Sequence, residues 1–93
     1  MILFASDALS DARRVRKFLE EKNPDAAARA MRAIWLLLKR VEAYPNSGKA
    51  TKDPRVRQVT VLTGRSGYIV RYSVLADGTI FVTRIWHGRE ARA

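Results

Sequence analysis

The hydrophobic periodicity of this 93-residue chain changes at Pro54, and that change constrains the fold more than any other feature. Before Pro54, apolar residues recur every three or four positions, the spacing that gives a helix one buried stripe. After Pro54 they recur at every second position, as they do on a half-buried strand. The sequence therefore predicts an α+β protein in which helices precede most of the sheet.

The helical part of the chain divides into two helices at Asn23-Pro24-Asp25. Proline is tolerated in a first helical turn, and Asn23 can cap the helix that begins there. Ser6 or Asp7 is the expected cap of the first helix. The two apolar stripes consist of Ala8, Ala12, Val15 and Leu19, and of Ala27, Ala30, Met31, Ile34, Leu37, Leu38 and Val41. Because the connection is short, the two helices are predicted to form an antiparallel hairpin.

The second half of the chain contains three strand-like segments joined by two turn signals. Gly64-Arg65-Ser66-Gly67 and Asp77-Gly78 both have the composition of hairpin connections. The segments are therefore predicted to form an antiparallel meander. Alternation along the last segment is expected to place Ile80, Val82, Arg84 and Trp86 on one face and Phe81, Thr83, Ile85 and His87 on the other.

A chain of this length is expected to build one hydrophobic core, so residues 1–93 are predicted to form a single domain. Residues 2–4 are apolar and are expected to supply an N-terminal strand. The predicted fold is therefore an N-terminal strand and an antiparallel helical hairpin, packed on a mainly antiparallel sheet that a C-terminal three-strand meander completes.

The composition excludes several kinds of chemistry. With no cysteine and one histidine, the chain has no disulfide, no thiol nucleophile and no multi-histidine metal centre. It lacks the glycine-rich motifs that hold nucleotide phosphates, so neither a metal nor a cofactor is expected. No apolar run approaches the length of a membrane span, and the N-terminus does not resemble a signal peptide. A cytoplasmic protein with no membrane partner is expected.

The charge is strongly positive and unevenly distributed. The chain carries 18 Lys and Arg against 9 Asp and Glu, a formal net charge of +9. Residues 45–93 hold nine basic and three acidic residues, a net charge of +6, whereas residues 6–44 have a net charge of only +3. A small basic domain of this kind attracts phosphate groups or an acidic protein.

The basic residues of the second half are the candidate binding groups. Arg57, Arg71, Arg84 and His87 are expected to converge near one rim of the sheet. The candidate target- or phosphate-binding residues are Lys49, Lys52, Arg57, Arg71, Arg84 and Arg89. Such a cluster can bind RNA phosphates, and a guanidinium can stabilise a phosphorane while His87 transfers a proton. The alternative is that the arginines are solvated charges at sheet edges.

The two tryptophans, Trp35 and Trp86, are expected to pack in the core or between the helices and the sheet. A stacking platform for a nucleic-acid base is the less favoured interpretation of Trp86.

Six features in a fixed order make the chain resemble a known superfamily. They are Ser6-Asp7-Ala8 through Asp11, the alanines of residues 26–30, Tyr44-Pro45-Asn46-Ser47-Gly48, a strand carrying Arg57, Gly67-Tyr68-Ile69-Val70-Arg71-Tyr72, and Arg84-Ile85-Trp86-His87-Gly88-Arg89. Together they resemble the RelE/ParE superfamily of toxins from type II toxin-antitoxin systems. The resemblance covers nearly the whole chain.

The resemblance implies a cytoplasmic toxin that a cognate antitoxin holds inactive. Antitoxins of such pairs wrap an acidic, often disordered C-terminal segment over the toxin, which agrees with the positive charge of this chain. The resemblance also implies that the pair binds operator DNA through the antitoxin and not through this chain.

The superfamily contains two activities. ParE-like members poison DNA gyrase, and the ending Arg84 to Arg89 favours this activity. RelE-like members are ribosome-dependent mRNA interferases. For that activity the resemblance implies Arg65 and Arg89 as the counterparts of catalytic arginines, with His87 as the acid or base. The protein is an enzyme only in that second case. A third alternative is a binding module of the same fold that is not toxic.

Overall fold

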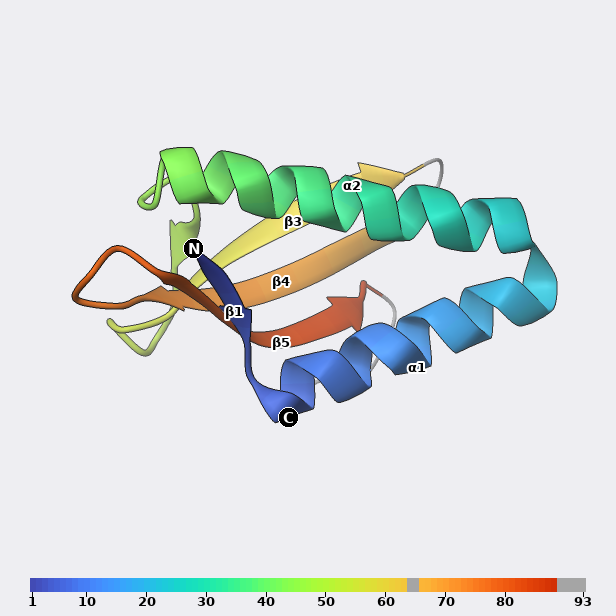
Figure 1. Ribbon diagram of the computed structural model, residues 1–93, viewed down its shortest axis with the longest axis horizontal. Coiled ribbons are helices and arrows are strands. Elements are labelled where there is room, and N and C mark those ends of the chain that lie inside the picture. Colours follow the sequence, from blue (N-terminus) through green and yellow to red (C-terminus); the bar gives the residue numbers. More distant parts are fainter. Residues whose placement is uncertain (64–65, 89–93) are drawn as a thin grey trace.

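The computed structural model describes residues 1–63 and 66–88. Two helices, α1 (Ser6–Lys22) and α2 (Pro24–Ala43), pack side by side on one face of a sheet, as Figure 1 shows. The strands are β1 (Ile2–Phe4), β2 (Lys49–Ala50), β3 (Arg57–Thr63), β4 (Ser66–Val74) and β5 (Ile80–His87). The predicted α+β architecture is confirmed.

The five strands form one mixed sheet in the order β1-β5-β4-β3-β2. The predicted meander of β3, β4 and β5 is antiparallel, and β1 joins it as a parallel neighbour of β5. The two-residue strand β2, which was not among the strands predicted from the sequence, pairs antiparallel to β3. Because β1 contains only three residues, it covers β5 from Ile80 to Val82 and leaves the rest of that strand as an edge.

The core lies between the helices and one face of the sheet. α1 contacts β5, and α2 contacts β3. The buried apolar residues that form this core are Ala8 and Val15 of α1, Ala30, Ile34, Leu38 and Val41 of α2, and Tyr68, Val70, Tyr72, Ile80, Val82 and Ile85 of the sheet. The apolar stripes of both helices therefore face the sheet as predicted. We call the opposite side of the sheet the open face.

The caps of the two helices differ. Ala5 occupies the cap position of α1 without a side-chain hydrogen bond, so the predicted cap at Ser6 or Asp7 is wrong. The reason is that Ala5 still belongs to the strand connection, where its N–H donates to the carbonyl of Val82. The predicted cap of α2 is confirmed, because Asn23 Oδ1 accepts hydrogen bonds from the N–H groups of Asp25 and Ala26.

We expect Asn23→Ala to lower the free energy of unfolding by about 1 kcal/mol, because two helix N–H groups lose their acceptor. The measurement is urea denaturation followed by circular dichroism. Asn46→Ala is the matched control, since the Asn46 side chain makes no hydrogen bond to the described residues. Equal losses in the two variants would contradict the capping role of Asn23.

A register irregularity in β5 decides which side chains share a face. Arg71 pairs with Arg84 and the next residue, Tyr72, pairs with Val82, so Thr83 is an extra residue without a partner. An extra residue of this kind is a β-bulge, which resets the alternation of the strand. Arg84 and Trp86 consequently lie on the open face, whereas Val82 faces the helices. The predicted grouping of Arg84 and Trp86 with Ile80 and Val82 is therefore wrong.

Neither helix in the described part of the chain has the length and hydropathy needed to span a membrane.

Candidate functional site

A row of polar and basic side chains crosses the open face at right angles to the strands. Lys49 of β2 pairs with Gln58 of β3, Gln58 pairs with Arg71 of β4, and Arg71 pairs with Arg84 of β5. Directly paired residues project from the same face of a sheet. Strands lie about 4.8 Å apart, so the row spans roughly 14 Å. We call these four residues the basic row.

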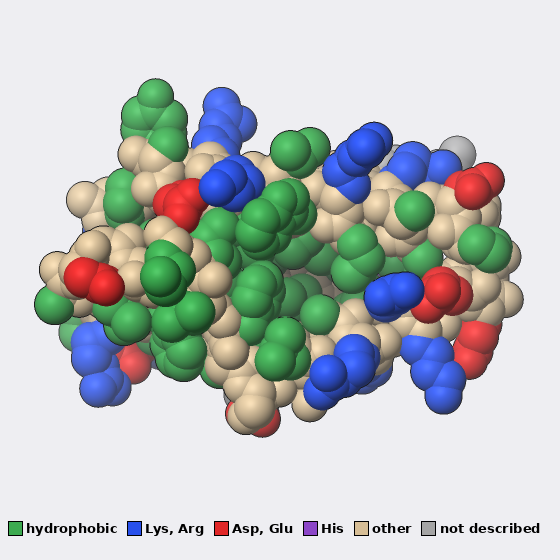
Figure 2. All heavy atoms as spheres, viewed as in Figure 1, with side chains coloured by type: hydrophobic (Ala, Val, Ile, Leu, Met, Phe, Trp, Pro, Cys, Tyr) green, Lys and Arg blue, Asp and Glu red, His purple; other side chains and the backbone are tan. Residues whose placement is uncertain are grey.

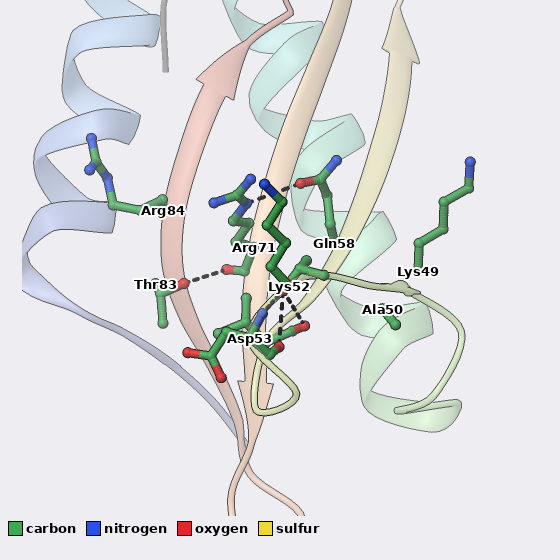
Figure 3. A pocket seen from close by; sticks show the side chains of 10 residues that line it. Lys49, Ala50, Lys52, Asp53, Gln58, Arg71, Thr83 and Arg84 are labelled. Carbon is green, nitrogen blue, oxygen red and sulfur yellow. Dashed lines mark hydrogen bonds between the residues drawn. The ribbon is translucent and has the colours of Figure 1, made fainter. Parts of the chain in front are cut away.

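The basic row lines an open groove of about 900 Å³. Thr51, Lys52, Asp53 and Val56, from the connection between β2 and β3, also line it, as do Ala50 and Thr83. Figure 3 shows Lys49 and Arg84 at opposite ends, with Arg71 between them. Four candidate residues from the sequence, Lys49, Lys52, Arg71 and Arg84, therefore meet in one place, which we call the basic groove.

Trp86 lies beneath the two arginines of the groove. The guanidinium carbon of Arg71 is 4.9 Å from the centre of the indole ring, and that of Arg84 is 5.1 Å away. Both distances fall within the range of cation–π attraction. Arg71 is also held by Gln58, whose Oε1 accepts a hydrogen bond of 3.0 Å from Arg71 Nε. The site thus combines two guanidinium groups with one indole.

The packing predicted for the two tryptophans is only partly observed. Trp86 is buried, with 5% of its surface exposed, but it lies on the open face instead of between the helices and the sheet. Trp35 of α2 is 48% exposed and is not a core residue. The bulge at Thr83 explains the position of Trp86, because a regular strand would have turned this side chain toward the helices.

Asp11 of α1 holds Arg84 in place. Arg84 Nε donates to Asp11 Oδ2 at 2.7 Å, and Arg84 Nη2 donates to Oδ1 at 3.2 Å. Asp11 is only 2% exposed. It also accepts hydrogen bonds from Arg14 Nη1 at 2.7 Å and from the N–H of Ile85 at 2.9 Å. Burial alone would raise the pKa of Asp11, but the hydrogen bonds from Arg84, Arg14 and Ile85 together lower it to about 2.

The position of Asp11 follows from the short first strand. Where β1 ends, β5 lacks a neighbour, and a strand edge leaves backbone groups without partners. Asp11 accepts a hydrogen bond from the N–H of Ile85, and Arg14 Nη2 donates one of 3.3 Å to the carbonyl oxygen of Ile85. Two side chains of α1 therefore supply hydrogen-bond partners for the N–H and the carbonyl of Ile85 at this strand edge. Asp11 was not among the candidate residues from the sequence, although its spacing from Ala8 and Val15 places it beside the buried stripe.

Arg57 lies outside the basic groove. It pairs with Tyr72, whose side chain is buried under the helices, so Arg57 projects from the helix-facing side of β3. Arg57 Nη1 donates to the carbonyl oxygens of Gly48 at 2.8 Å and Asn46 at 3.4 Å. The residue thus secures the turn that follows α2.

His87 also lies on the helix-facing side. It pairs with Tyr68, and the two rings meet edge to face with their centres 5.3 Å apart. The structure therefore separates His87 from Arg71 and Arg84, which lie on the open face. The other two candidate catalytic residues, Arg65 and Arg89, lie outside the described residues. Within residues 1–63 and 66–88, no group of three or more histidine, aspartate and glutamate side chains is arranged to hold a metal ion.

Comparison of the sequence with protein families and curated proteins gives consistent matches. The family model described as "ParE toxin of type II toxin-antitoxin system, parDE" matches residues 2–92. Toxin RelE1 of Caulobacter vibrioides is 34% identical over 91 residues, which cover 98% of this chain and 96% of that protein. Toxin RelE3 of the same organism is 29% identical over 85 residues, which cover 91% of this chain and 90% of that protein.

Solved structures share the fold. The chromosomal ParDE system from P. aeruginosa matches with a TM-score of 0.72 and 20% identity over 90% of each chain. The intact E. coli RelBE toxin-antitoxin complex matches with a TM-score of 0.65 and 20% identity, over 99% of this chain and 98% of that one. The resemblance to the RelE/ParE superfamily is confirmed, and the chain belongs to the ParE toxin family of type II toxin-antitoxin systems.

Proposed function

We propose that this toxin arrests growth by poisoning DNA gyrase and that a cognate antitoxin neutralises it. The observation that carries the proposal is the composition of the basic groove. Its described lining contains four cationic side chains but no histidine or tyrosine. Among these described lining residues the one carboxylate, Asp53, accepts hydrogen bonds from the side chain and the N–H of Arg55, which lower its pKa. Such a groove is suited to binding and not to proton transfer.

The open face beside the groove supports a protein target. Leu62 is 77% exposed, and Thr60 is exposed on the same strand. Ile69 and Trp86, which pair on the neighbouring strands, are both buried, with 8% and 5% of their surface exposed. Interfaces between proteins combine apolar, aromatic and arginine side chains, whereas a nucleic-acid surface is more uniformly basic. The exposed Leu62 beside the two arginines of the groove is the combination of a protein interface.

An antitoxin partner is supported by charge and by exposed apolar surface. The net charge of +9 favours an acidic partner. Figure 2 shows hydrophobic side chains gathered over the centre of the face that carries the two helices. Leu3, Leu9, Phe18, Trp35 and Leu36 are among the large hydrophobic residues exposed on β1, α1 and α2. Apolar surface of this extent typically marks an interaction site.

A ribosome-dependent mRNA interferase is the second candidate function. The observation that favours it is the pairing at one end of the sheet. His87 pairs with Tyr68, and the N–H of Gly88 donates to the carbonyl of Gly67 at 2.7 Å. Arg65 and Arg89 are close in sequence to these paired residues. The Caulobacter relatives also carry RelE names.

We expect induction of the chain without an antitoxin to stop DNA synthesis before protein synthesis, in a culture pulse-labelled for both. The purified chain is expected to inhibit supercoiling by gyrase. Lys49→Gln combined with Lys52→Gln is expected to weaken this inhibition about tenfold, because two groove cations are lost. Arg32→Gln, an exposed change on α2, is the control.

Three results would contradict gyrase poisoning. An early stop in translation that Arg65→Ala, His87→Ala or Arg89→Ala abolishes would assign the interferase activity. The absence of any growth effect would leave a binding module. Unimpaired supercoiling at high toxin concentration would also exclude the proposed target.

A further inference from the structure

Arg71 and Arg84 form a pair of like charges that the fold holds together. They are direct cross-strand partners, and both guanidinium groups lie over the indole of Trp86. Like charges placed directly opposite each other destabilise a sheet. Departures from such local rules are expected where a site serves a function. The pair is therefore a candidate ligand site.

Hydrogen-bond donors of both arginines are left for a ligand. Arg84 donates hydrogen bonds from Nε and Nη2 to Asp11, and its Nη1 makes no hydrogen bond to the described residues. Arg71 donates a hydrogen bond from Nε to Gln58, and neither of its terminal nitrogens makes a hydrogen bond within the described part of the chain. A guanidinium whose terminal nitrogens are available matches the two oxygens of a carboxylate or phosphate.

The charges at the site are only partly balanced. Asp11 compensates Arg84, whereas the salt bridges of the described residues include none to Arg71. Trp86 offsets some of the repulsion, because the face of an indole attracts cations. One further anion would pair with Arg71 and reduce the repulsion across the two strands.

We propose that Arg71 and Arg84, held over Trp86, form an anion site that binds a carboxylate of an acidic segment in the target protein. The proposal deepens the proposed function, on which it rests for the choice of a protein as the partner. Arginine and tryptophan dominate the binding energy of protein interfaces. The neighbouring open face exposes the apolar side chain of Leu62, so an acidic residue near an apolar one fits better than a chain of phosphates.

Trp86 supplies a direct reporter of binding. The chain contains two tryptophans, and Trp35 is exposed on α2, so Trp35→Phe leaves Trp86 as the only tryptophan. In this variant, titration with hexaglutamate is expected to change the emission of Trp86 with a saturable curve. A thymidine oligonucleotide of the same charge is the phosphate probe, and it is expected to bind more weakly than hexaglutamate.

Arg71→Gln in the same background is expected to weaken hexaglutamate binding about tenfold, because the uncompensated guanidinium is lost. Arg32→Gln removes the same charge from α2 and is expected to change binding by less than about twofold. Arg71→Lys keeps the charge without the planar guanidinium, and its loss of hexaglutamate binding is expected to lie between the losses of Arg71→Gln and Arg32→Gln. Circular dichroism establishes whether each variant is folded. If Arg71→Gln is unfolded, Arg71→Lys is compared with Arg32→Gln instead.

Equal losses in Arg71→Gln and Arg32→Gln would show that only net charge matters and would overturn the site. Tighter binding of the oligonucleotide would overturn the choice of a carboxylate. The titration contains no gyrase, so it separates the site from the proposed function. Hexaglutamate binding at Arg71 together with unimpaired supercoiling would uphold the anion site and reject gyrase as the target.

Discussion

Replacing Asp11 with alanine is expected to lower the free energy of unfolding by about 3 kcal/mol. The change removes the acceptor of the Ile85 N–H and the anion that pairs with Arg84 and Arg14. The full cost of a broken buried pair is not expected, because the Arg84 side chain is 39% exposed and can be hydrated. Urea denaturation followed by circular dichroism measures the loss.

Glu21→Ala is the matched control for this loss. Glu21 is an exposed carboxylate on the same helix, and its removal is expected to change stability by no more than about 0.5 kcal/mol. A similar effect of the two substitutions would mean that α1 is stabilised by its overall charge and not by the bonds of Asp11.

The pH dependence provides an independent measurement on the same residue. The pKa of Asp11 is lowered from 3.8 to about 2 in the folded protein. A lowered folded-state pKa stabilises the protein above the unfolded-state value, and this contribution is lost as the pH falls through the folded-state value. The shift corresponds to about 2 kcal/mol. The stability difference between the native chain and Asp11→Asn is therefore expected to hold above about pH 5 and to shrink toward pH 2.

The features that sequence predicted correctly depend on local spacing. The apolar stripes of the two helices, the cap at Asn23 and the turn at Asp77-Gly78 all involve residues close together in the chain. Period-two alternation likewise accounts for Tyr68, Val70 and Tyr72 on one face of β4, and the core contains all three. Signals of this kind need no knowledge of which strands pair.

The features that sequence missed depend on pairing between distant residues. The bulge at Thr83 is defined only against its partners on β4, so alternation alone assigned Arg84 and Trp86 to the wrong face. Asp11 was not identified because its partners, Arg84 and Ile85, follow it by 73 and 74 positions. Basic composition did identify four residues of the groove, but only the register shows that three of them form a row.

The face of a strand also decides the chemistry of the site. Adjacent residues of a strand project to opposite sides, so His87 and Trp86 are separated although they are neighbours in sequence. Arg57 is separated from Gln58 in the same way. The described lining of the basic groove therefore contains four cations, two of which lie over the indole of Trp86. The histidine that could transfer a proton contacts Tyr68 on the other side.

Gly48→Ala is expected to lower the free energy of unfolding by about 2–3 kcal/mol, because a Cβ has no room there. It would lie 2.6 Å from Tyr72 Oη, 2.9 Å from Tyr72 Cε1 and 3.1 Å from Arg57 Cβ. Tyr72 cannot move easily, since it is fully buried and its hydroxyl donates to the carbonyl of Pro45 at 2.8 Å. Gly67→Ala is the control, because its nearest neighbour is the flexible end of Leu62 at 3.3 Å.

A double-mutant cycle with Tyr72→Phe tests the cause of this loss. Tyr72→Phe alone is expected to cost about 1–2 kcal/mol, since its hydroxyl also accepts the Gly48 N–H at 3.0 Å. The double variant is expected to lose about 1 kcal/mol less than the sum of the single losses, because the closest clashing atom is absent. Additive losses would place the strain elsewhere. Lys49, the first residue of the basic row, directly follows Gly48. Gly48→Ala and Tyr72→Phe are therefore also expected to weaken the proposed inhibition of gyrase by displacing Lys49.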